Sequence, residues 1–204
     1  MDNARQPTVT VAPQSFAQLV SLACHDLRTP LATASGFART LQRLDEIAPP
    51  ADRYVEMIGA ATDQLADLRD LLGAVARIES DRFEPQLRAT NTRELADDAA
   101  RRIEDGRAAV EGDGAAVNAD WQWAAVSLGA LAEAARRHGG LDRITLRVEG
   151  PLVAMTPIVG NAGAIAMGDE LRDFPAAVGA QVLQRSGADV KLDADALRVR
   201  FPEP

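Results

Sequence analysis

Residues 16–44 decide the fold of the first part of the chain, and they read FAQLVSLACHDLRTPLATASGFARTLQRL. Apolar and small side chains recur there at alternating spacings of four and three residues, which is the pattern of a helix that packs along one seam. We therefore predict one long amphipathic helix over this segment. The seam consists of Phe16, Val20, Ala23, Leu27, Pro30, Ala34, Phe37, Leu41 and Leu44.

Pro30 is the unusual member of this seam, because a proline inside a helix removes a backbone hydrogen bond and clashes with the carbonyl of Asp26. One interpretation is that the helix stops at Thr29. The seam nevertheless keeps its phase beyond the proline. That continuity favours a single helix, kinked at Pro30 and ending near Ile47.

A second amphipathic run, over residues 52–78, follows a short break at Pro49 and Pro50. Two long helices joined by a short loop predict an antiparallel hairpin. A lone hairpin leaves its apolar stripe half covered, so we expect a homodimer in which two hairpins form a four-helix bundle. The stripe of the second run consists of Val55, Ile58, Leu65, Leu68, Leu72 and Val75, with Thr62 as the one hydroxyl in the row.

After Glu79, short strand-like and helical segments alternate, which predicts a separate α/β or α+β domain and an α+β class for the chain. We expect a loose tail over residues 1–14, the hairpin over 15–79 and the second domain over 80–204. The expected elements are a linker and strand at 81–88, a helix from Asn91 or Thr92 to Ile103, helices at 121–137 and 175–185, a strand at 144–148, and a hairpin of 190–192 with 197–201.

Composition narrows the class of partner. The chain has 204 residues, of which 47% are hydrophobic, so it can bury a core, and its net charge of -8 repels nucleic acid and anionic membranes. One cysteine cannot form an internal disulfide, and residues 1–14 lack the pattern of a signal peptide, so we expect a cytoplasmic protein. The uncharged stretch Gly150 to Gly168 contains prolines and glycines and is interpreted as soluble backbone.

His25 is the candidate for chemistry. Counting the seam residues as heptad positions a and d places His25 at position f, where the side chain points into solvent; an incidental surface histidine is the plain alternative. Arg28 and Thr29 lie within one turn on the same side. A neutral imidazole is a nucleophile near pH 7, the adjacent Asp26 could hold its second proton, and Arg28 could neutralise a transferring phosphoryl group.

The string at residues 22–31, LACHDLRTPL, resembles the H-box of bacterial histidine kinases. This resemblance implies a dimerisation and histidine phosphotransfer hairpin, with His25 as the phosphoacceptor and Asp26 as its acid/base partner. Thr29 matches the position that family members use to orient a water during dephosphorylation of a response regulator. The run CHDL at 24–27 is also similar to the ChpT-type histidine phosphotransferases, although the following Arg-Thr-Pro is kinase-like.

The rest of the chain resembles the family's ATP-binding domain more weakly, with residues 117–138 similar to the strand and N-box helix and 178–202 similar to the last helix and hairpin. The nucleotide-binding residues are missing. Ala134 stands where the N-box asparagine is expected, no Asp-x-Gly-x-Gly follows the strand at 144–148, and residues 174–179 read FPAAVG instead of a Gly-x-Gly-Leu turn. The resemblance therefore implies a degenerate ATPase-like α/β sandwich with no cofactor of its own.

Together these features favour a histidine phosphotransferase that relays phosphoryl groups between response-regulator receiver aspartates through His25, without binding ATP. The receiver would bring its own aspartate and magnesium, and the expected partners are a second copy of the chain and receiver domains. Three alternatives stay open. The chain could be a pseudokinase or one half of a split histidine kinase, phosphorylated or used as a scaffold by a partner histidine kinase; it could be an autokinase with altered boxes; or it could be a purely structural dimer.

Overall fold

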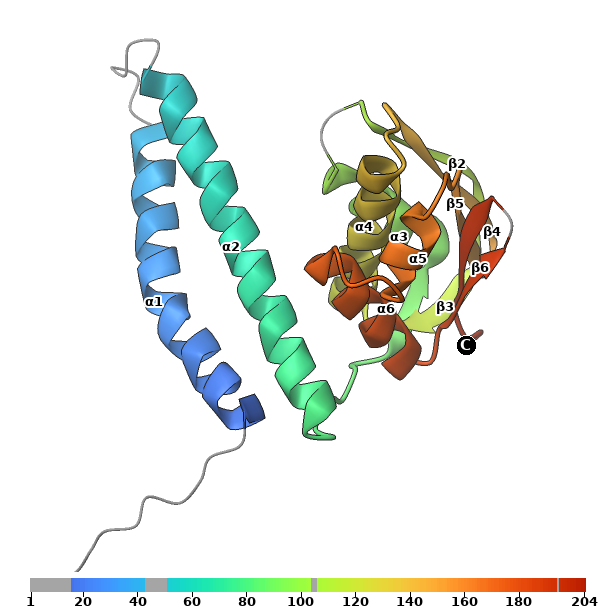
Figure 1. The fold of residues 1–204 in the computed structure, drawn as a ribbon, viewed down its shortest axis with the longest axis horizontal. Coiled ribbons are helices and arrows are strands. Elements are labelled where there is room, and N and C mark those ends of the chain that lie inside the picture. Colours follow the sequence, from blue (N-terminus) through green and yellow to red (C-terminus); the bar gives the residue numbers. More distant parts are fainter. Residues whose placement is uncertain (1–15, 43–50, 104–105, 194) are drawn as a thin grey trace, which may run out of the picture.

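Two long helices stand beside a layered α/β domain in the computed structural model, which describes residues 16–42, 51–103, 106–193 and 195–204 (Figure 1). Helix α1, Phe16–Gln42, and helix α2, Ala51–Glu79, run antiparallel and contact each other along their length. This confirms the predicted hairpin. Helix α1 passes through Pro30 without a break, so the interpretation that it stops at Thr29 is wrong. Its predicted end near Ile47 lies outside the described residues.

A single hairpin covers only part of the predicted seam. Among the described seam residues of α1, Val20 and Ala34 are half-buried, whereas Phe37 is 68% exposed and Leu27 is 46% exposed. On α2, Thr62 is buried and its hydroxyl donates to the carbonyl of Ile58 at 3.0 Å, so this polar member of the stripe is satisfied within the helix. The hairpin therefore leaves large apolar side chains in solvent, as the sequence pattern predicts for a lone copy.

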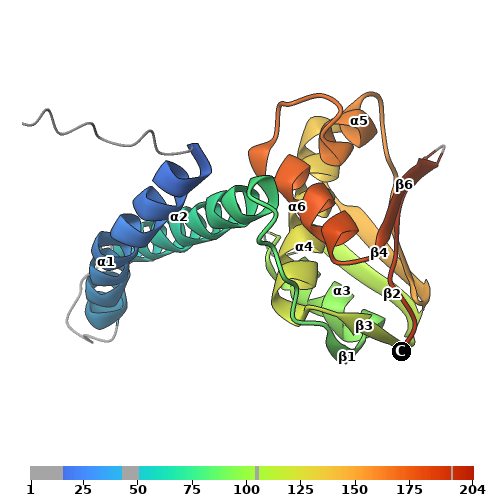
Figure 2. The ribbon, with the colours of Figure 1, turned by 90° about the horizontal axis from the view of Figure 1, so that it is seen from below.

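The second domain is built on a five-stranded mixed sheet with strand order β2-β4-β5-β7-β6, in which only β2 and β4 pair in parallel. A separate antiparallel pair joins β1 and β3. The helices α3 to α6 cover the face of the large sheet that is turned toward the hairpin (Figures 1 and 2). The bounds are β1 Arg88–Asn91, α3 Thr92–Arg101, β2 Ala108–Gly114, β3 Ala116–Ala119, α4 Trp121–His138, β4 Ile144–Gly150, β5 Leu152–Thr156, α5 Ala162–Met167, α6 Phe174–Arg185, β6 Asp189–Asp193 and β7 Ala196–Arg200.

Side-chain caps fix where the main helices begin. Asn91 accepts a hydrogen bond from the backbone N–H of Arg93 at 2.8 Å at the start of α3. Asp173 accepts from the N–H of Ala176 at 3.1 Å at the start of α6, with a proline in the first turn. Each cap satisfies a backbone donor that the helix itself leaves unpaired. The capping residue predicted for α3 is thereby confirmed.

Alternation along the strands builds the core between the sheet and its helices. Ile144, Leu146 and Val148 of β4 are all 1% exposed or less, while the residues between them face the other side. They belong to one apolar cluster with Leu128 and Leu131 of α4. Full burial of such a side chain contributes roughly 1.5–3 kcal/mol.

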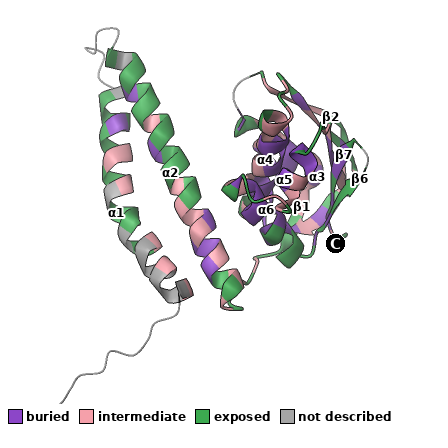
Figure 3. Cartoon of the chain, viewed as in Figure 1, coloured by how far each residue is buried: buried purple, intermediate pink, exposed green. Residues whose placement is uncertain are grey.

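The hairpin is also packed onto the second domain. A second apolar cluster joins Leu71 and Ala74 of α2 to Val178 and Val182 of α6, with Trp123 of α4 at its border. Figure 3 shows the buried residues of α2 concentrated in the half of the helix that leads to this contact. This packing was not predicted, because Leu71 and Ala74 lie outside the apolar stripe predicted for the hairpin.

Most elements predicted for the second domain are confirmed, namely the helices α3, α4 and α6, the strand β4 and the hairpin of β6 with β7. The expected position of the first strand, within residues 81–88, is corrected by the structure, in which β1 begins only at Arg88. Strands β2 and β5 and helix α5 were not predicted, since β2 and α5 are rich in small residues and the short strand β5 lacks an alternating pattern. No helix among the described residues is long and apolar enough to cross a membrane.

Candidate functional site

His25 lies on the exposed side of α1, where its heptad position predicts it. A small cavity of about 130 Å³ opens beside it, between the two helices of the hairpin. The size is suited to a small group attached to the imidazole rather than to a nucleotide. The described residues that line the cavity are Cys24, His25 and Arg28 from α1, and Arg69, Asp70, Gly73 and Arg77 from α2.

The cavity is rich in positive charge. Arg69 is largely buried and donates from Nε to Asp70 at 2.9 Å, so one carboxylate holds that guanidinium in place. Arg77 lies across Gly73, where an added Cβ would come within 3.4 Å of its Nη1 atom. The cavity is thus lined by three guanidinium groups, those of Arg28, Arg69 and Arg77, and by one described carboxylate, that of Asp70. Such a site favours an anion with several acceptor oxygens, as a phosphoryl group has.

Cys24 ties the two helices together beside the cavity. Its thiol donates to the backbone carbonyl of Arg69 at 3.3 Å. Burial raises the pKa of the Cys24 thiol, and the nearby positive charges of Arg69 and Arg77 only partly oppose that effect. The side chain is therefore held as a neutral thiol that packs between the two helices.

The H-box residues predicted to take part in the chemistry all lie on α1, and they are His25, Asp26, Arg28 and Thr29. Among those with described side chains, His25 and Arg28 line the cavity. Thr29 is exposed one turn further on and is not among the described residues that line the cavity. Its backbone carbonyl accepts a hydrogen bond from the hydroxyl of Thr33 at 3.0 Å. The side chain of Asp26 lies outside the described residues.

Sequence reasoning missed the half of the site that α2 supplies. Arg69, Asp70 and Arg77 lie more than forty residues beyond His25, and no local motif marks them. The signal that could have found them is geometric. In an antiparallel hairpin with a short loop, the last third of α2 lies beside the first third of α1, so the arginines of that part of α2 face the H-box.

Arg77 also connects the cavity to the second domain. Its Cζ atom lies 5.7 Å from the ring centroid of Trp123, a cation–π distance. The ring of Phe83, in the segment between α2 and β1, packs edge-on against Trp123 at a centroid distance of 6.2 Å. The guanidinium at the edge of the His25 cavity is thus in contact with an aromatic pair anchored in α4 and the linker.

The position at which the resemblance expects the N-box asparagine lies inside the core of the second domain. Ala134 is 1% exposed and belongs to the apolar core with Ala166 and Ala176, and the helices α5 and α6 both pack against α4. At the start of α6 the buried carboxylate of Asp173 forms an ion pair with Arg137 and lies 3.2 Å from Nε2 of His138. Among the residues that the structure describes, no group of three His, Cys, Asp or Glu side chains is placed to hold a metal ion.

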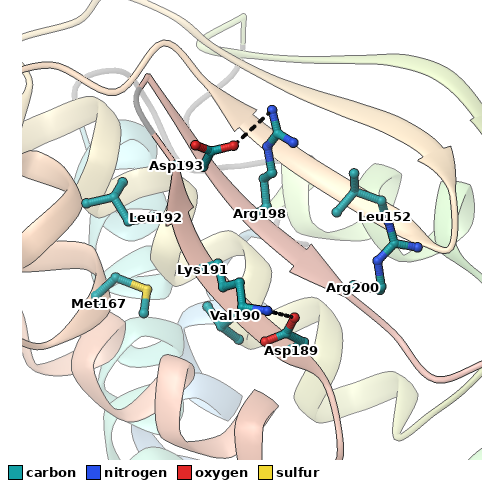
Figure 4. Close-up of a pocket in the computed structure, with 9 residues that line it drawn as sticks. All are labelled: Leu152, Met167, Asp189, Val190, Lys191, Leu192, Asp193, Arg198 and Arg200. Atoms are coloured by element: carbon teal, nitrogen blue, oxygen red, sulfur yellow. Dashed lines mark hydrogen bonds and ion pairs between the residues drawn. The ribbon is translucent and has the colours of Figure 1, made fainter.

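Strands β6 and β7 lie on the side of the domain away from the hairpin (Figure 1). A larger cavity, of about 580 Å³, is lined by residues of these strands (Figure 4). Its cationic groups are partly neutralised within the cavity, since Lys191 pairs with Asp189 at 2.6 Å and Arg198 pairs with Asp193 at 3.5 Å. The described side chains that line it include no histidine, cysteine or serine. The smaller cavity beside His25 is therefore the better candidate for chemistry.

Comparison with known proteins supports this choice. Residues 17–81 match the His Kinase A (phospho-acceptor) domain, a segment that contains both helices of the hairpin and His25. The hairpin is therefore similar to the phospho-acceptor domain of histidine kinases, which supports a role in two-component signalling. No significant relative is found among curated protein sequences.

Solved structures show the same arrangement of hairpin and α/β domain. Full-length ShkA in complex with AMPPNP has a TM-score of 0.54 at 17% identity over 92% of this chain, which spans only 45% of ShkA. The Acinetobacter baumannii histidine kinase AdeS has a TM-score of 0.51 at 13% identity, covering 87% of this chain and 97% of AdeS. The cytoplasmic segment of histidine kinase QseC has a TM-score of 0.52 at 8% identity, covering 79% and 99%. These likenesses establish a histidine kinase-like fold.

Proposed function

We propose that the chain is a histidine phosphotransferase of a two-component phosphorelay, in which His25 carries phosphoryl groups between receiver-domain aspartates and no ATP is bound. The observation that carries the proposal is the contrast between two places in the fold. One is an exposed histidine beside an arginine-lined cavity within a phospho-acceptor domain. The other is a tightly packed alanine, Ala134, where a kinase of this family would need a nucleotide-binding asparagine.

The reaction requires little from the chain beyond a positioned imidazole. A ring nitrogen of His25 attacks the phosphorus of a receiver's aspartyl phosphate, a P–N bond forms, and the P–O bond to the aspartate breaks as the carboxylate leaves with its electron pair. The proton on the other ring nitrogen stays on the ring, where Asp26 is proposed to hold it. Transfer to the next receiver aspartate reverses these steps.

Charge stabilisation is divided between the two proteins. The transferring phosphoryl group spreads negative charge over three oxygens, and catalysis depends mainly on positioning and on opposing charge. The receiver would supply magnesium on its own side. The chain would supply the guanidinium groups of Arg28, Arg69 and Arg77, which already surround the cavity.

The exposed apolar side chains of the hairpin support the second expected partner, another copy of the chain. A single hairpin leaves a discontinuous row of large residues in solvent, which a second hairpin would cover in a four-helix bundle. The row consists of Leu27, Phe37 and Leu41 on α1, with Ile58 and Leu65 on α2.

One observation favours a second candidate function. The family match contains both helices of the hairpin and His25, as it would in one half of a split histidine kinase whose His25 is phosphorylated by a partner kinase. The ChpT-type resemblance stays a prediction. The H-box string is similar both to histidine kinases and to ChpT-type phosphotransferases, so it does not decide between the two proposed functions.

The deciding experiment offers purified protein two sources of labelled phosphate, ATP alone and a phosphorylated receiver domain. We expect acid-labile label from the receiver only, lost in His25→Ala and kept in His138→Gln, a matched control because the chain has two histidines. Label taken directly from ATP would refute the proposal. Failure of every receiver from the same genome, with labelling by a partner kinase, would establish the split-kinase alternative instead.

A further inference from the structure

Arg77 occupies a position between two parts of the fold that the proposed function does not connect. Its side chain lines the cavity of His25 on one side and lies over the ring of Trp123 on the other. Trp123 belongs to α4 of the second domain, whereas His25 belongs to the hairpin. A residue of the degenerate domain therefore contacts a cationic group of the phosphotransfer site.

Several contacts make this arrangement stiff. The Arg77 guanidinium lies along α2 over Gly73, where an added Cβ would be in van der Waals contact with Nη1 at 3.4 Å. Trp123 is fixed at the first turn of α4, because its backbone N–H donates to Asp120 at 3.3 Å and the ring packs against Phe83. The same Asp120 accepts from the backbone of the linker residue Gln86 at 2.8 Å, which fastens the linker to the start of the helix.

We propose that Trp123 is a positioning residue for phosphoryl transfer at His25: its ring holds the Arg77 guanidinium at the edge of the cavity. This inference rests on the proposed function of His25. An arginine on an exposed helix position has several rotamers of similar energy, and only some direct its charge toward the cavity. Contact with an aromatic face selects among them before the phosphoryl group arrives, so less ordering is left to the transition state.

Electrostatic coupling within the cavity agrees with this placement. The positive charge of Arg77 is close enough to lower the pKa of Cys24, the residue directly before His25, against the larger effect of burial. Because Arg77 and His25 line the same cavity, we expect this charge to act also on a phosphoryl group carried by the imidazole. The second domain would then serve catalysis through one aromatic ring, with no need for a nucleotide.

The test uses the full chain and two phosphoryl donors, a phosphorylated receiver domain and the small molecule phosphoramidate. With the receiver, the maximal rate constant of His25 phosphorylation and the half-saturating receiver concentration are measured separately. We expect Trp123→Leu to lower the maximal rate constant about three- to thirty-fold, the range of a cation–π contact, with little change in the half-saturating concentration. Trp123→Phe keeps an aromatic face and should retain most of the rate.

A double-mutant cycle separates positioning from general damage. In an Arg77→Met background, Trp123→Leu should cause no further loss, because the group that it positions is already gone. Trp121→Leu, at the exposed tryptophan two residues earlier, is the matched control and should leave the rate unchanged. Equal losses from Trp123→Leu with and without Arg77 would overturn the inference, as would an effect on receiver affinity alone.

Two further readouts keep the outcome decisive. If Trp123→Leu does not fold, Arg77→Met and Arg77→Lys, at an exposed position, carry the test, and a rate equal to wild type in both would overturn the inference. If the wild-type chain accepts no phosphoryl group from any receiver, the proposed function fails. The phosphoramidate series still measures the coupling between Trp123 and Arg77, so the two failures are distinguishable.

Discussion

An asparagine at the expected N-box position tests whether the second domain contains a nucleotide site, and we expect Ala134→Asn to damage the fold instead. Ala134 is 1% exposed and lies in the apolar core against α5 and α6. An asparagine there needs more volume than the core provides and brings a polar amide with no partner among apolar neighbours.

The expected cost follows from these two effects. Overpacking of a dense core costs roughly 1–3 kcal/mol, and a buried amide without hydrogen bonds costs about 1–3 kcal/mol more. Loss of helix propensity adds about 0.6 kcal/mol. The same substitution at Ala130, on the same helix but half-exposed, should cost little beyond the propensity. The difference between the two variants is therefore expected to be roughly 2–6 kcal/mol.

The measurement is urea denaturation followed by circular dichroism, with and without magnesium and ATP. At a slope near 2 kcal/mol per molar urea, the midpoint of Ala134→Asn should lie about 1–3 M below that of Ala130→Asn. A ligand that binds the folded state would raise the midpoint. Because we propose that ATP does not bind, we expect no rise in the midpoint when ATP is added. Equal midpoints for the two variants, or stabilisation of Ala134→Asn by ATP, would refute the reasoning, because the position would then face an open site.

Three other outcomes follow from single positions. Cys24 is the only cysteine. Because burial raises its pKa, less thiolate is present at pH 8, and iodoacetamide should alkylate Cys24 more slowly than it alkylates glutathione. Unfolding in urea should abolish this difference in rate. Phe37→Asp, at a side chain 68% exposed in the single chain, should convert a dimer to a monomer by light scattering; an unchanged mass would exclude this surface from the interface. Gly112→Ala should lower the free energy of unfolding by roughly 2–4 kcal/mol, because φ is +86° and the added Cβ would lie 2.1 Å from the carbonyl oxygen of Val148. Gly106→Ala, where φ is +77° and the space is open, should cost only about 1 kcal/mol in the same denaturation assay.

The features that could be predicted from sequence are those that depend on one helix or one short motif. The phase of the seam requires only α1, and it placed His25 on the exposed side without knowledge of any partner. Helix starts were predictable where a capping residue precedes an amphipathic run, as Asn91 does for α3. The homology signal was likewise local, because the H-box string at 22–31 lies within the matched segment.

The features that could not be predicted depend on contacts between distant segments. Arg69 and Arg77 meet His25 only through the register of the hairpin, and Trp123 meets Arg77 only because α2 packs on the second domain. Helix α5 was missed within a stretch interpreted as plain backbone, since its small residues have no amphipathic pattern. Helix α5 packs so close to β6 that a Cβ added at Gly163 would lie 2.6 Å from the side chain of Leu192.

The packing gives the second domain a role under the proposed function, in which no nucleotide is bound. Alanine is the best helix former and fits a dense core, so Ala134 in α4 carries no penalty in stability. Removal of α6 would be different, because Leu71 and Ala74 of α2 are buried against Val178 and Val182 and would become exposed. The half of α2 that bears Arg69 and Arg77 is thus held by the second domain. Selection on the geometry at His25 is therefore sufficient to retain that domain, with or without ATP.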